Sequence, residues 1–245
     1  MAETMYRFSI DRGGTFTDVY AEVPGDPGFR VVKLLSENPA HYPDAPLEGI
    51  RRILQDVSGI PLPMEKFDTS RVEWVRMGTT VATNALLERK GEPCALLITK
   101  GFGDLLRIGK QNRPDLFDLK VKKPDPLYET IVEVEERVRV VDKAEGREDI
   151  NLVQGISGDL IEILQAPDLD RIEKDLQPVL ERGIRSLAVV LMHSWTWPDH
   201  ELQIGALAEK MGFAQVSLSS RVMPRVKIVE RGQTCCVAAY LTPAI

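Results

Sequence analysis

A ten-residue stretch close to the N-terminus, Ile-Asp-Arg-Gly-Gly-Thr-Phe-Thr-Asp-Val (residues 10–19), most constrains what this chain can fold into. An apolar, strand-like segment runs into Asp11, Gly13 and Gly14, and a second strand-like segment begins at Phe16. Glycine lacks a Cβ, so the backbone at these positions can take φ > 0 and direct its N–H groups at an anion. A carboxylate at the end of a strand can hold Mg²⁺ directly or through its water ligands. The stretch predicts either a hairpin that binds nucleotide phosphates or an ordinary hairpin turn, for which Asp and Gly are the usual residues.

Charge and cysteine content narrow the classes of function. The 245 residues include 31 Lys and Arg against 37 Asp and Glu, a net charge of −6, so neither nucleic acid nor an anionic membrane is an expected partner. No apolar run approaches the roughly 20 residues of a membrane span. Cys94, Cys235 and Cys236 have no metal-ligand spacing and predict a reducing compartment, hence a cytosolic protein without a signal peptide.

Hydrophobic periodicity and turn residues predict an N-terminal β-meander followed by alternating helices and strands. Asp44 is a candidate N-cap for a helix that runs through Leu54 and ends before Gly59. The run 94–99 is continuously apolar, as in a central parallel strand covered on both faces. The predicted strands are 6–10, 16–23, 29–35, 72–77, 94–99, 186–192 and 216–218, and the predicted helices are 44–54, 82–90, 169–180, 200–211 and 233–241.

Residues 110–166 interrupt this alternation with prolines, glycines and scattered charges, and predict an inserted segment with short strands. Three antiparallel strands followed by helix, strand, helix, strand and helix is the element order of a ribonuclease-H-like domain. That α/β fold, a mixed sheet of three antiparallel strands and then parallel strands, forms one ATP-handling lobe in the actin, sugar-kinase and Hsp70 group. Because the first hairpin meets the nucleotide phosphates in that group, the predicted topology supports the phosphate-binding interpretation.

Several longer motifs resemble the hydantoinase/oxoprolinase family, and together they extend over the whole chain. They are the decapeptide 10–19, Lys-Leu-Leu-Ser-Glu (33–37), Gly-Ile-Arg-Arg-Ile-Leu (49–54), Arg-Met-Gly-Thr-Thr-Val-Ala-Thr-Asn-Ala-Leu-Leu-Glu-Arg-Lys-Gly (76–91), Ile-Thr-Lys-Gly-Phe-Gly-Asp-Leu-Leu (98–106), Asp-Leu-Phe-Asp-Leu (115–119) and Gly-Ile-Arg-Ser-Leu-Ala-Val-Val-Leu-Met-His-Ser (183–194). The resemblance implies a family N-terminal domain at 5–230, with an insertion at roughly 110–166, and the start of a following hydantoinase A-type domain at 231–245.

The resemblance implies hydrolysis of 5-oxo-L-proline to L-glutamate with ATP and Mg²⁺, within the γ-glutamyl cycle of glutathione turnover. Phosphorylation of the lactam oxygen would make the ring carbon an electrophile for water, and phosphoryl transfer asks a protein mainly for positioning and charge stabilisation. Because family members are longer than 245 residues, the chain is expected to be an N-terminal fragment that is inactive without the C-terminal region, in an enzyme that forms a homodimer at full length. The alternatives are a truncated module that only binds, a hydantoinase-type cyclic amide hydrolase, and a small sugar-kinase-type kinase, which the absence of a second Asp-Gly turn after residue 190 disfavours.

The resemblance also assigns residues of the first hairpin to the nucleotide site. These are Asp11 for catalysis through the metal or its water shell, Gly13, Gly14 and Thr15 for the phosphates, and Thr17 and Asp18 as weaker phosphate ligands that could instead face solvent. A second candidate site, for substrate or another anion, lies where a predicted strand ends and a helix begins. Its residues are Gly78, Thr79, Thr80, Thr83 and Asn84, with a threonine-capped helix start as the alternative.

Other conspicuous side chains favour structural roles. His193 and His200 have no Cys or His partner at ligand spacing. Trp195 and Trp197 flank a proline corner and are predicted to fill a gap at the surface. The adjacent cysteines near the C-terminus lie on an apolar helix face and are predicted to be core.

Overall fold

A computed structural model describes residues 5–110, 115, 117, 123–141 and 152–244. The chain forms two compact units, Met1–Glu88 and Arg89–Ile245, each with its own sheet and apolar core. Of the predicted insertion at 110–166, residues 111–114, 116, 118–122 and 142–151 lie outside the described residues. Part of the family-like motif 115–119 and the final residue of the predicted second domain also lie outside them.

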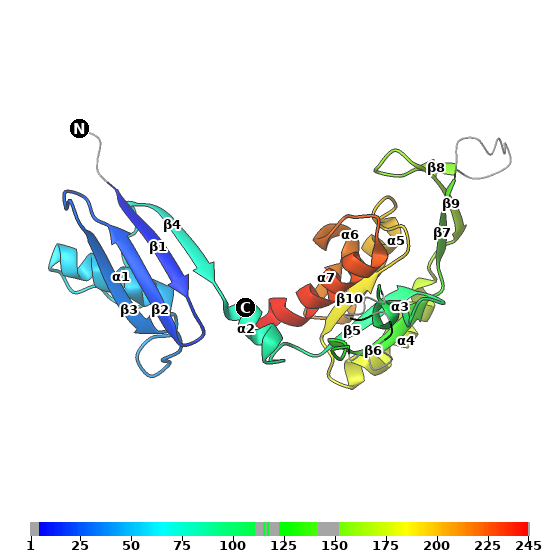
Figure 1. Cartoon of the computed structure of the whole chain (residues 1–245), viewed down its shortest axis with the longest axis horizontal. Coiled ribbons are helices and arrows are strands. Elements are labelled where there is room, and N and C mark those ends of the chain that lie inside the picture. Colours follow the sequence, from blue (N-terminus) through cyan, green and yellow to red (C-terminus); the bar gives the residue numbers. More distant parts are fainter. Residues whose placement is uncertain (1–4, 111–114, 116, 118–122, 142–151, 245) are drawn as a thin grey trace. The chain divides into compact units, whose positions relative to one another are not determined.

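The first unit contains a four-stranded sheet of order β3-β2-β1-β4 (Figure 1). The pairs β1–β2 and β2–β3 are antiparallel, which confirms the predicted meander, and β4 lies parallel to β1 at the edge of the sheet. The strands are β1 (Tyr6–Arg12), β2 (Phe16–Glu22), β3 (Phe29–Leu35) and β4 (Val72–Thr79). The short helix α2 (Val81–Leu87) follows β4.

Helix α1 (Ala45–Ser58) covers one face of this sheet and packs against β1, β2 and β3 (Figure 1). As predicted, the Asp44 side chain caps it by accepting a hydrogen bond from Leu47 N at 2.7 Å. Gly59 ends the helix with φ of 67°, in the left-handed region that glycine adopts readily. The core between helix and sheet is formed by Tyr6, Phe8, Ile10, Val19, Ala21, Val23, Ile50, Ile53 and Leu54.

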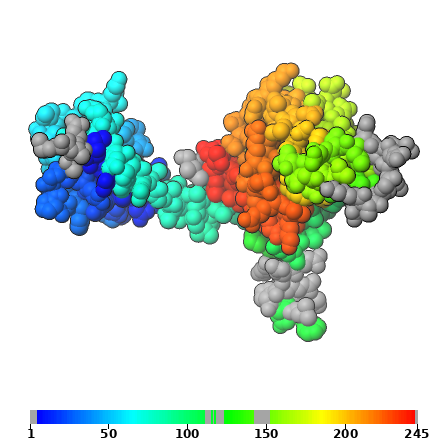
Figure 2. All heavy atoms as spheres, turned by 90° about the horizontal axis from the view of Figure 1, so that it is seen from above, coloured from blue at the N-terminus to red at the C-terminus, as the bar shows by residue number. Residues whose placement is uncertain are grey.

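The second unit is a parallel sheet of order β11-β10-β5-β6 with helices on both faces. Helices α4 and α5 pack on one face and α7 on the other, and Figure 2 shows the green to red segments packed into one body. All residues of β5 and β10 are buried, which confirms the predicted central strands. The elements are β5 (Cys94–Thr99), α3 (Leu105–Ile108), β6 (Tyr128–Val134), α4 (Leu169–Glu181), β10 (Ser186–Val190), α5 (Asp199–Met211), β11 (Gln215–Leu218), α6 (Ser219–Val222), α7 (Ile228–Leu241) and a final 3₁₀ turn (Thr242–Ala244).

The structure differs from the predicted single mixed sheet. Strand β5 pairs with β10 and β6 rather than with β4, so the strands fall into separate sheets. Strand β6, which lies within the predicted insertion, belongs to the parallel sheet, whereas β7 (Arg137–Val141), β8 (Leu152–Gln154) and β9 (Leu160–Gln165) form a three-stranded sheet of order β7-β9-β8. A continuous apolar run indicates that both faces of a strand are covered, but not which strand lies beside it.

Helix α7 crosses the predicted domain boundary at 230/231 and packs on β10 and β11. Cys235 and Cys236 on this helix are buried, as predicted, and all three cysteines of the chain are free. Leu241 at the end of the helix is buried too. Among the helices of the described residues, none is long and apolar enough to cross a membrane.

Candidate phosphate-binding site

The predicted phosphate loop is the tight turn that joins β1 to β2. In the antiparallel register, Asp11 lies opposite Asp18 and Arg12 opposite Thr17, and Gly13 N donates to Phe16 O at 2.9 Å. The next two residues are exposed, and their amides donate to no group of the described residues. Two neighbouring N–H groups without partners at the tip of a hairpin are suited to contact an anion.

Ser36, immediately after β3, holds the turn in place. Its amide donates to Thr15 O at 2.9 Å, and its hydroxyl donates to Gly13 O at 2.6 Å. The same hydroxyl lies 3.0 Å from the hydroxyl of Thr17, which is fully buried. Thr17 was predicted to contact the phosphates or, alternatively, to face solvent. The structure instead buries its side chain beneath the turn, because its strand position faces the core. Ser36 lies in a quoted family-like motif, but the sequence alone did not connect it with the turn.

The two glycines permit close contacts and do not adopt the predicted positive φ. Neither Gly13 nor Gly14 has a positive φ in the left-handed region. A Cβ on Gly13 would lie 3.0 Å from Phe16 O, and a Cβ on Gly14 would lie 3.0 Å from Asn84 Nδ2. These distances are shorter than ordinary contacts, so the absence of a side chain permits a close approach of neighbouring groups.

The close approach to Asn84 brings the two predicted sites together. In the parallel register of β1 and β4, Asp11 lies beside Gly78 and Arg12 beside Thr79. The Thr79 hydroxyl donates to Arg12 O at 2.9 Å, and Thr80 N donates to the same carbonyl at 3.3 Å. The segments that follow β1 and β4 thus lie side by side at the carboxyl ends of these parallel strands. The two strands are far apart in the sequence, since 66 residues separate their first residues, Tyr6 and Val72.

The remaining residues of the second candidate site lie at the start of α2. Val81 N donates to the hydroxyl of Thr79 at 3.1 Å, while Thr80 makes no capping bond through its side chain. The predicted threonine cap is therefore present, one residue earlier than the helix boundary suggests. Thr80 and Thr83 are exposed, and their hydroxyls make no hydrogen bond within the described part of the chain. Thr79 thus caps the helix, whereas the hydroxyls of Thr80 and Thr83 have no partner among the described residues.

The charged side chains around the turn differ in their partners. Asp11 is exposed, and no described residue forms a hydrogen bond or ion pair with it. Both carboxylate oxygens of Asp18 lie 2.9 Å from Lys33 Nζ, so this side chain is already paired. Arg12 Nε is buried without a hydrogen-bond partner in the described structure, which leaves a cationic group beside the turn with unused donor capacity.

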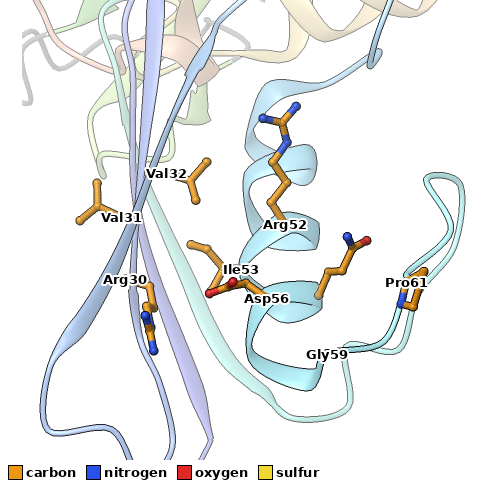
Figure 3. Close-up of a pocket in the computed structure, with 9 residues that line it drawn as sticks. Arg30, Val31, Val32, Arg52, Ile53, Asp56, Gly59 and Pro61 are labelled. Atoms are coloured by element: carbon orange, nitrogen blue, oxygen red, sulfur yellow. The ribbon is translucent and has the colours of Figure 1, made fainter.

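An open pocket of the first unit lies elsewhere. It has a volume of about 660 Å³ and lies between β3 and the C-terminal half of α1, with Arg30, Val32 and Arg52 on its walls (Figure 3). Arg30 lies near the start of β3, whereas the phosphate turn adjoins the end of that strand. The pocket and the turn are therefore at opposite ends of β3. Arg30 is paired with Asp26, and Arg52 with Glu48. This pocket is distinct from the candidate phosphate site.

Comparisons with known proteins agree on one family. A family model for the hydantoinase/oxoprolinase N-terminal region matches residues 7–212. The chain is 53% identical over 244 residues to 5-oxoprolinase 1 of Arabidopsis thaliana, and 50% identical over 245 residues to 5-oxoprolinase of Dictyostelium discoideum. These alignments cover 99% and 98% of this chain but only 19% of each relative.

The fold recurs in a solved structure. The crystal structure of an ATP-dependent caprolactamase from Pseudomonas jessenii is similar with a TM-score of 0.70 and 23% identity, over 97% of this chain and 32% of that chain. At this identity the likeness concerns the fold. The family model covers most of the chain, and the quoted motifs lie largely within it. The chain therefore belongs to the hydantoinase/oxoprolinase family and corresponds to the N-terminal region of its members.

Proposed function

We propose that this chain supplies the phosphate-binding part of an ATP-dependent hydrolase that opens 5-oxo-L-proline to L-glutamate. The observation that carries the proposal is the contact between the turn 13–15 and the segment 78–80, which ends β4 and precedes α2. The two lie at the carboxyl ends of β1 and β4, beside the exposed carboxylate of Asp11. The relatives named 5-oxoprolinase and the fold shared with an ATP-dependent caprolactamase support it. The chain spans 19% of those relatives, so the rest of the activity would reside in their further regions.

The turn would act on the phosphates chiefly through its backbone. The amides of Gly14 and Thr15 would donate to phosphate oxygens, and Arg12 would supply positive charge next to them. Thr80 and Thr83 offer free hydroxyls on the neighbouring segment for a further anionic group. Positioning and charge stabilisation of this kind are what phosphoryl transfer requires of a protein.

Asp11 is the residue that fits a Mg²⁺ ion. Magnesium is commonly held by one or two protein carboxylates together with water and substrate phosphates, so one free carboxylate is sufficient. Asp18 is less suited because it is paired with Lys33. In the described residues no three His, Cys, Asp or Glu side chains form a cluster that could bind a metal by protein ligands alone, consistent with an ion that arrives with the nucleotide. When bound, it would neutralise charge on the phosphates.

Finer features of the protein belong to the same proposal. The strand order β3-β2-β1-β4 supports a ribonuclease-H-like lobe. The domain limits at 5–230 and 231–245 and the homodimer at full length remain predictions from the family resemblance. Three free, buried cysteines support a cytosolic location. A hydantoin substrate and a module that only binds are the alternatives, and neither is favoured by a particular contact in this structure.

Calorimetric titration of the chain with ATP and Mg²⁺ tests the phosphate site. Asp11→Asn keeps the size of the side chain and removes its charge, so we expect ATP affinity in the presence of Mg²⁺ to fall by about tenfold or more, with little change without the ion. Asp26→Asn, in another turn of the same unit and paired with Arg30, is the matched control and should bind as the parent does. Equal affinities for the two variants would contradict the assignment.

A competition experiment separates the substrate classes. The chain and an enzyme of the family at full length are each given ATP with 5-oxoproline or with hydantoin, and phosphate release is followed. We expect release with 5-oxoproline from the full-length enzyme and none from this chain alone. Release with hydantoin but not with 5-oxoproline would favour the alternative substrate, and 5-oxoproline-dependent release from the chain alone would show that the further regions are dispensable.

A further inference from the structure

Strand β3 lies at one edge of the sheet of the first unit, and its outer side is open. Its one strand partner among the described residues is β2. Ser36, which follows β3, donates its N–H to Thr15 O in this antiparallel pairing. Because bonded and non-bonded pairs alternate between antiparallel strands, every second residue of β3 counted back from Ser36 is bonded to β2. The N–H and C=O groups of Val31 and Lys33 therefore point away from β2, toward the outside of the sheet.

These outward groups in the middle of β3 have no partner in the part of the chain that the structure describes. No described residue forms a hydrogen bond with the main chain of Val31 or Lys33 on this side. At the end of the strand, Leu35 O accepts from the Tyr42 hydroxyl at 2.8 Å. The connection from β3 to α1 thus covers only the end of the open edge.

The usual devices that protect an edge strand are not found on β3. Such strands are commonly very short, bulged or lined with outward charges. Strand β3 has seven residues, and its register with β2 contains no shift. The Lys33 ammonium is bonded to Asp18 on β2, so it lies over the sheet rather than beyond its edge. The middle of β3 is therefore free to pair with another strand.

The pocket between β3 and α1 lies directly beside this open stretch. Its volume is about 660 Å³, and both strand residues and helix residues line it. Figure 3 shows Val32 directed toward α1 and Val31 directed away from it. Ile53 on the helix also lines the pocket and is 1% exposed, and Val32 packs against the core cluster that contains it. The floor between strand and helix is therefore apolar.

The outer wall of the pocket is the segment that follows α1, and it is fixed to the helix. Gly59 and Pro61 line the pocket. Leu62 N donates to Gln55 Oε1 at 3.2 Å, and Leu62 O accepts from Arg51 Nη1 at 2.9 Å. Leu62 also packs against the core of the unit. A groove that is formed before its ligand arrives does not spend binding free energy on being ordered.

One charged group of the pocket has no counter-ion. Arg30 is paired with Asp26, and Arg52 with Glu48, so both guanidinium groups already have a carboxylate partner. Asp56 is exposed, and no described residue forms an ion pair or a hydrogen bond with its carboxylate. Figure 3 shows this side chain directed from α1 toward β3. The pocket is therefore complementary to a cationic side chain.

We infer that the edge of β3 and the pocket beside it bind an extended, basic peptide segment of another protein, which adds to the sheet as an antiparallel strand. The main chain of the peptide bonds to the free N–H and C=O groups of Val31 and Lys33, and this requirement selects an extended segment. A lysine or arginine opposite Val32 faces α1. Its carbon stem covers Val32 and Ile53, while its charged end reaches Asp56.

A second copy of the chain, pairing through its own β3, is the competing occupant of this edge. The basic residue that it offers on the side facing α1 is Arg30, which is already paired with Asp26. A separate basic peptide has no such commitment and satisfies both the free main-chain groups and the carboxylate of Asp56. The inference uses no residue of the phosphate turn and does not rest on the proposed function.

Peptide titrations followed by nuclear magnetic resonance test the added strand. The probe is acetyl-Thr-Val-Thr-Lys-Thr-Val-Thr-amide, in which Val and Lys share one face of the strand and the threonines the other. Directly opposite residues of antiparallel strands share a face, so the two threonines beside Lys are bonded to Val31 and Lys33. We expect saturable shifts of the amide signals of these two β3 residues.

Two N-methylated forms of the probe are a matched pair. Methyl groups on the amides of the two threonines beside Lys remove both donors to β3, and each hydrogen bond is worth roughly 2- to 12-fold in affinity. We therefore expect this form to bind about tenfold more weakly or worse. Methyl groups on the two Val amides, which point away from β3, should leave the affinity close to that of the probe. Equal affinities for the two forms would overturn the inference.

Val31→Pro and Val31→Thr form the matched pair of protein variants. Proline is tolerated in an edge strand where the N–H faces outward, and here it removes one donor and obstructs the added strand. We expect Val31→Pro to abolish the peptide-induced shifts, and Val31→Thr, which keeps the N–H and the branched shape, to bind as the parent does. Both should bind ATP normally. If Val31→Pro fails to fold, the methylated peptides still decide; equal peptide binding by the two folded variants overturns the inference.

The basic side chain and the identity of the occupant are tested separately. Asp56→Asn should weaken binding of the probe roughly two- to fivefold, the effect of an exposed ion pair. Glu65→Gln, at an exposed position outside the pocket lining, should have no effect. Equal binding by these two variants would refute the assigned counter-ion. Sedimentation without peptide addresses the second copy: a concentration-dependent dimer that Val31→Pro abolishes would assign the edge to self-association and overturn the inference.

Discussion

The two units arrange polar groups at the carboxyl ends of their parallel strands in opposite ways. At the end of β1 the amides of Gly14 and Thr15 and the carboxylate of Asp11 are exposed and without partners in the described residues. At the end of β10 the side chains of Glu201 and Arg231 are fully buried and bonded to the backbone around them.

The difference separates two ways of building a site. An exposed turn that binds through its backbone amides needs mainly small residues. Forming such a turn costs little folding free energy, because only the local backbone is constrained. A buried network must satisfy every donor and acceptor, since an unpaired buried charge is strongly destabilising. We therefore expect substitutions in the exposed turn to lower ligand affinity, and substitutions in the buried network to lower the stability of the protein.

The largest expected effect is on stability, from Arg231→Met. The change removes the donors to Leu191 O and Ser219 and leaves Glu201 buried without its positive neighbour. We expect the free energy of unfolding to fall by about 3–5 kcal/mol in urea denaturation. Arg221→Met, at an exposed position on α6, should change it by less than about 0.5 kcal/mol. If Arg231→Met changes the free energy of unfolding no more than Arg221→Met does, the buried network does not stabilise the second unit, and the contrast between the two units is refuted.

The second effect is on affinity, from Gly14→Val. A Cβ at this position would lie 3.0 Å from Asn84 Nδ2, and the branched side chain would also cover the free amides. We expect ATP binding measured by calorimetry to weaken by at least about tenfold, or ~1.4 kcal/mol, with a smaller loss of unfolding free energy. Gly78→Ala is the matched comparison, because a Cβ there meets nothing within 4 Å and φ is not left-handed. If both variants bind alike, the close approach at Gly14 does not define the site.

The first unit shows how far sequence reasoning reaches. The decapeptide identified the turn, and Asp44 and Gly59 identified the ends of α1, because capping and turn formation depend on neighbouring residues. The meeting of Gly14 with Asn84 could not be predicted, since it depends on which strand pairs with β1. Thr17 was assigned to the phosphates, but strand alternation places it on the core face.

The second unit shows where such reasoning fails. His200 was predicted to have a structural role because no Cys or His lies at ligand spacing. Its buried partner, Glu136, lies 64 residues earlier and could not be predicted. Neither residue carries a local signal, because the buried pair joins the segment after β6 to the first turn of α5. Arg231 is likewise fully buried, and the sequence analysis did not single it out. Buried polar networks are therefore the part of this fold that only the structure reveals.

A third prediction concerns the pH dependence of stability. The pKa of His193 is lowered in the folded state, so the unfolded chain binds more protons below the ordinary histidine pKa of about 6.5. The contribution of His193 to the free energy of unfolding is therefore complete above the ordinary histidine pKa. It is lost as the pH falls from that value toward the lower pKa of the folded state. His193→Asn removes the titration and retains a residue that tolerates positive φ. We expect the variant to lose less stability between pH 7 and 5 than the parent, as measured by urea denaturation; a parallel decline would exclude His193 as the cause.

The smallest effect should come from Ser36→Ala, which tests whether the exposed turn needs its support. The change removes the hydroxyl bonds to Gly13 O and Thr17 but keeps the amide bond to Thr15 O. Because the buried hydroxyl of Thr17 would lose its partner, we expect a destabilisation of about 1 kcal/mol. ATP affinity should fall only a few-fold, since the free amides remain in place. Ser9→Ala, on β1 and without a side-chain hydrogen bond to any described residue, should be neutral in both measurements. A loss of ATP affinity as large as that of Gly14→Val, without a comparable loss of stability, would mean that Ser36 itself contacts the nucleotide and that the exposed site depends on side chains as much as the buried one does.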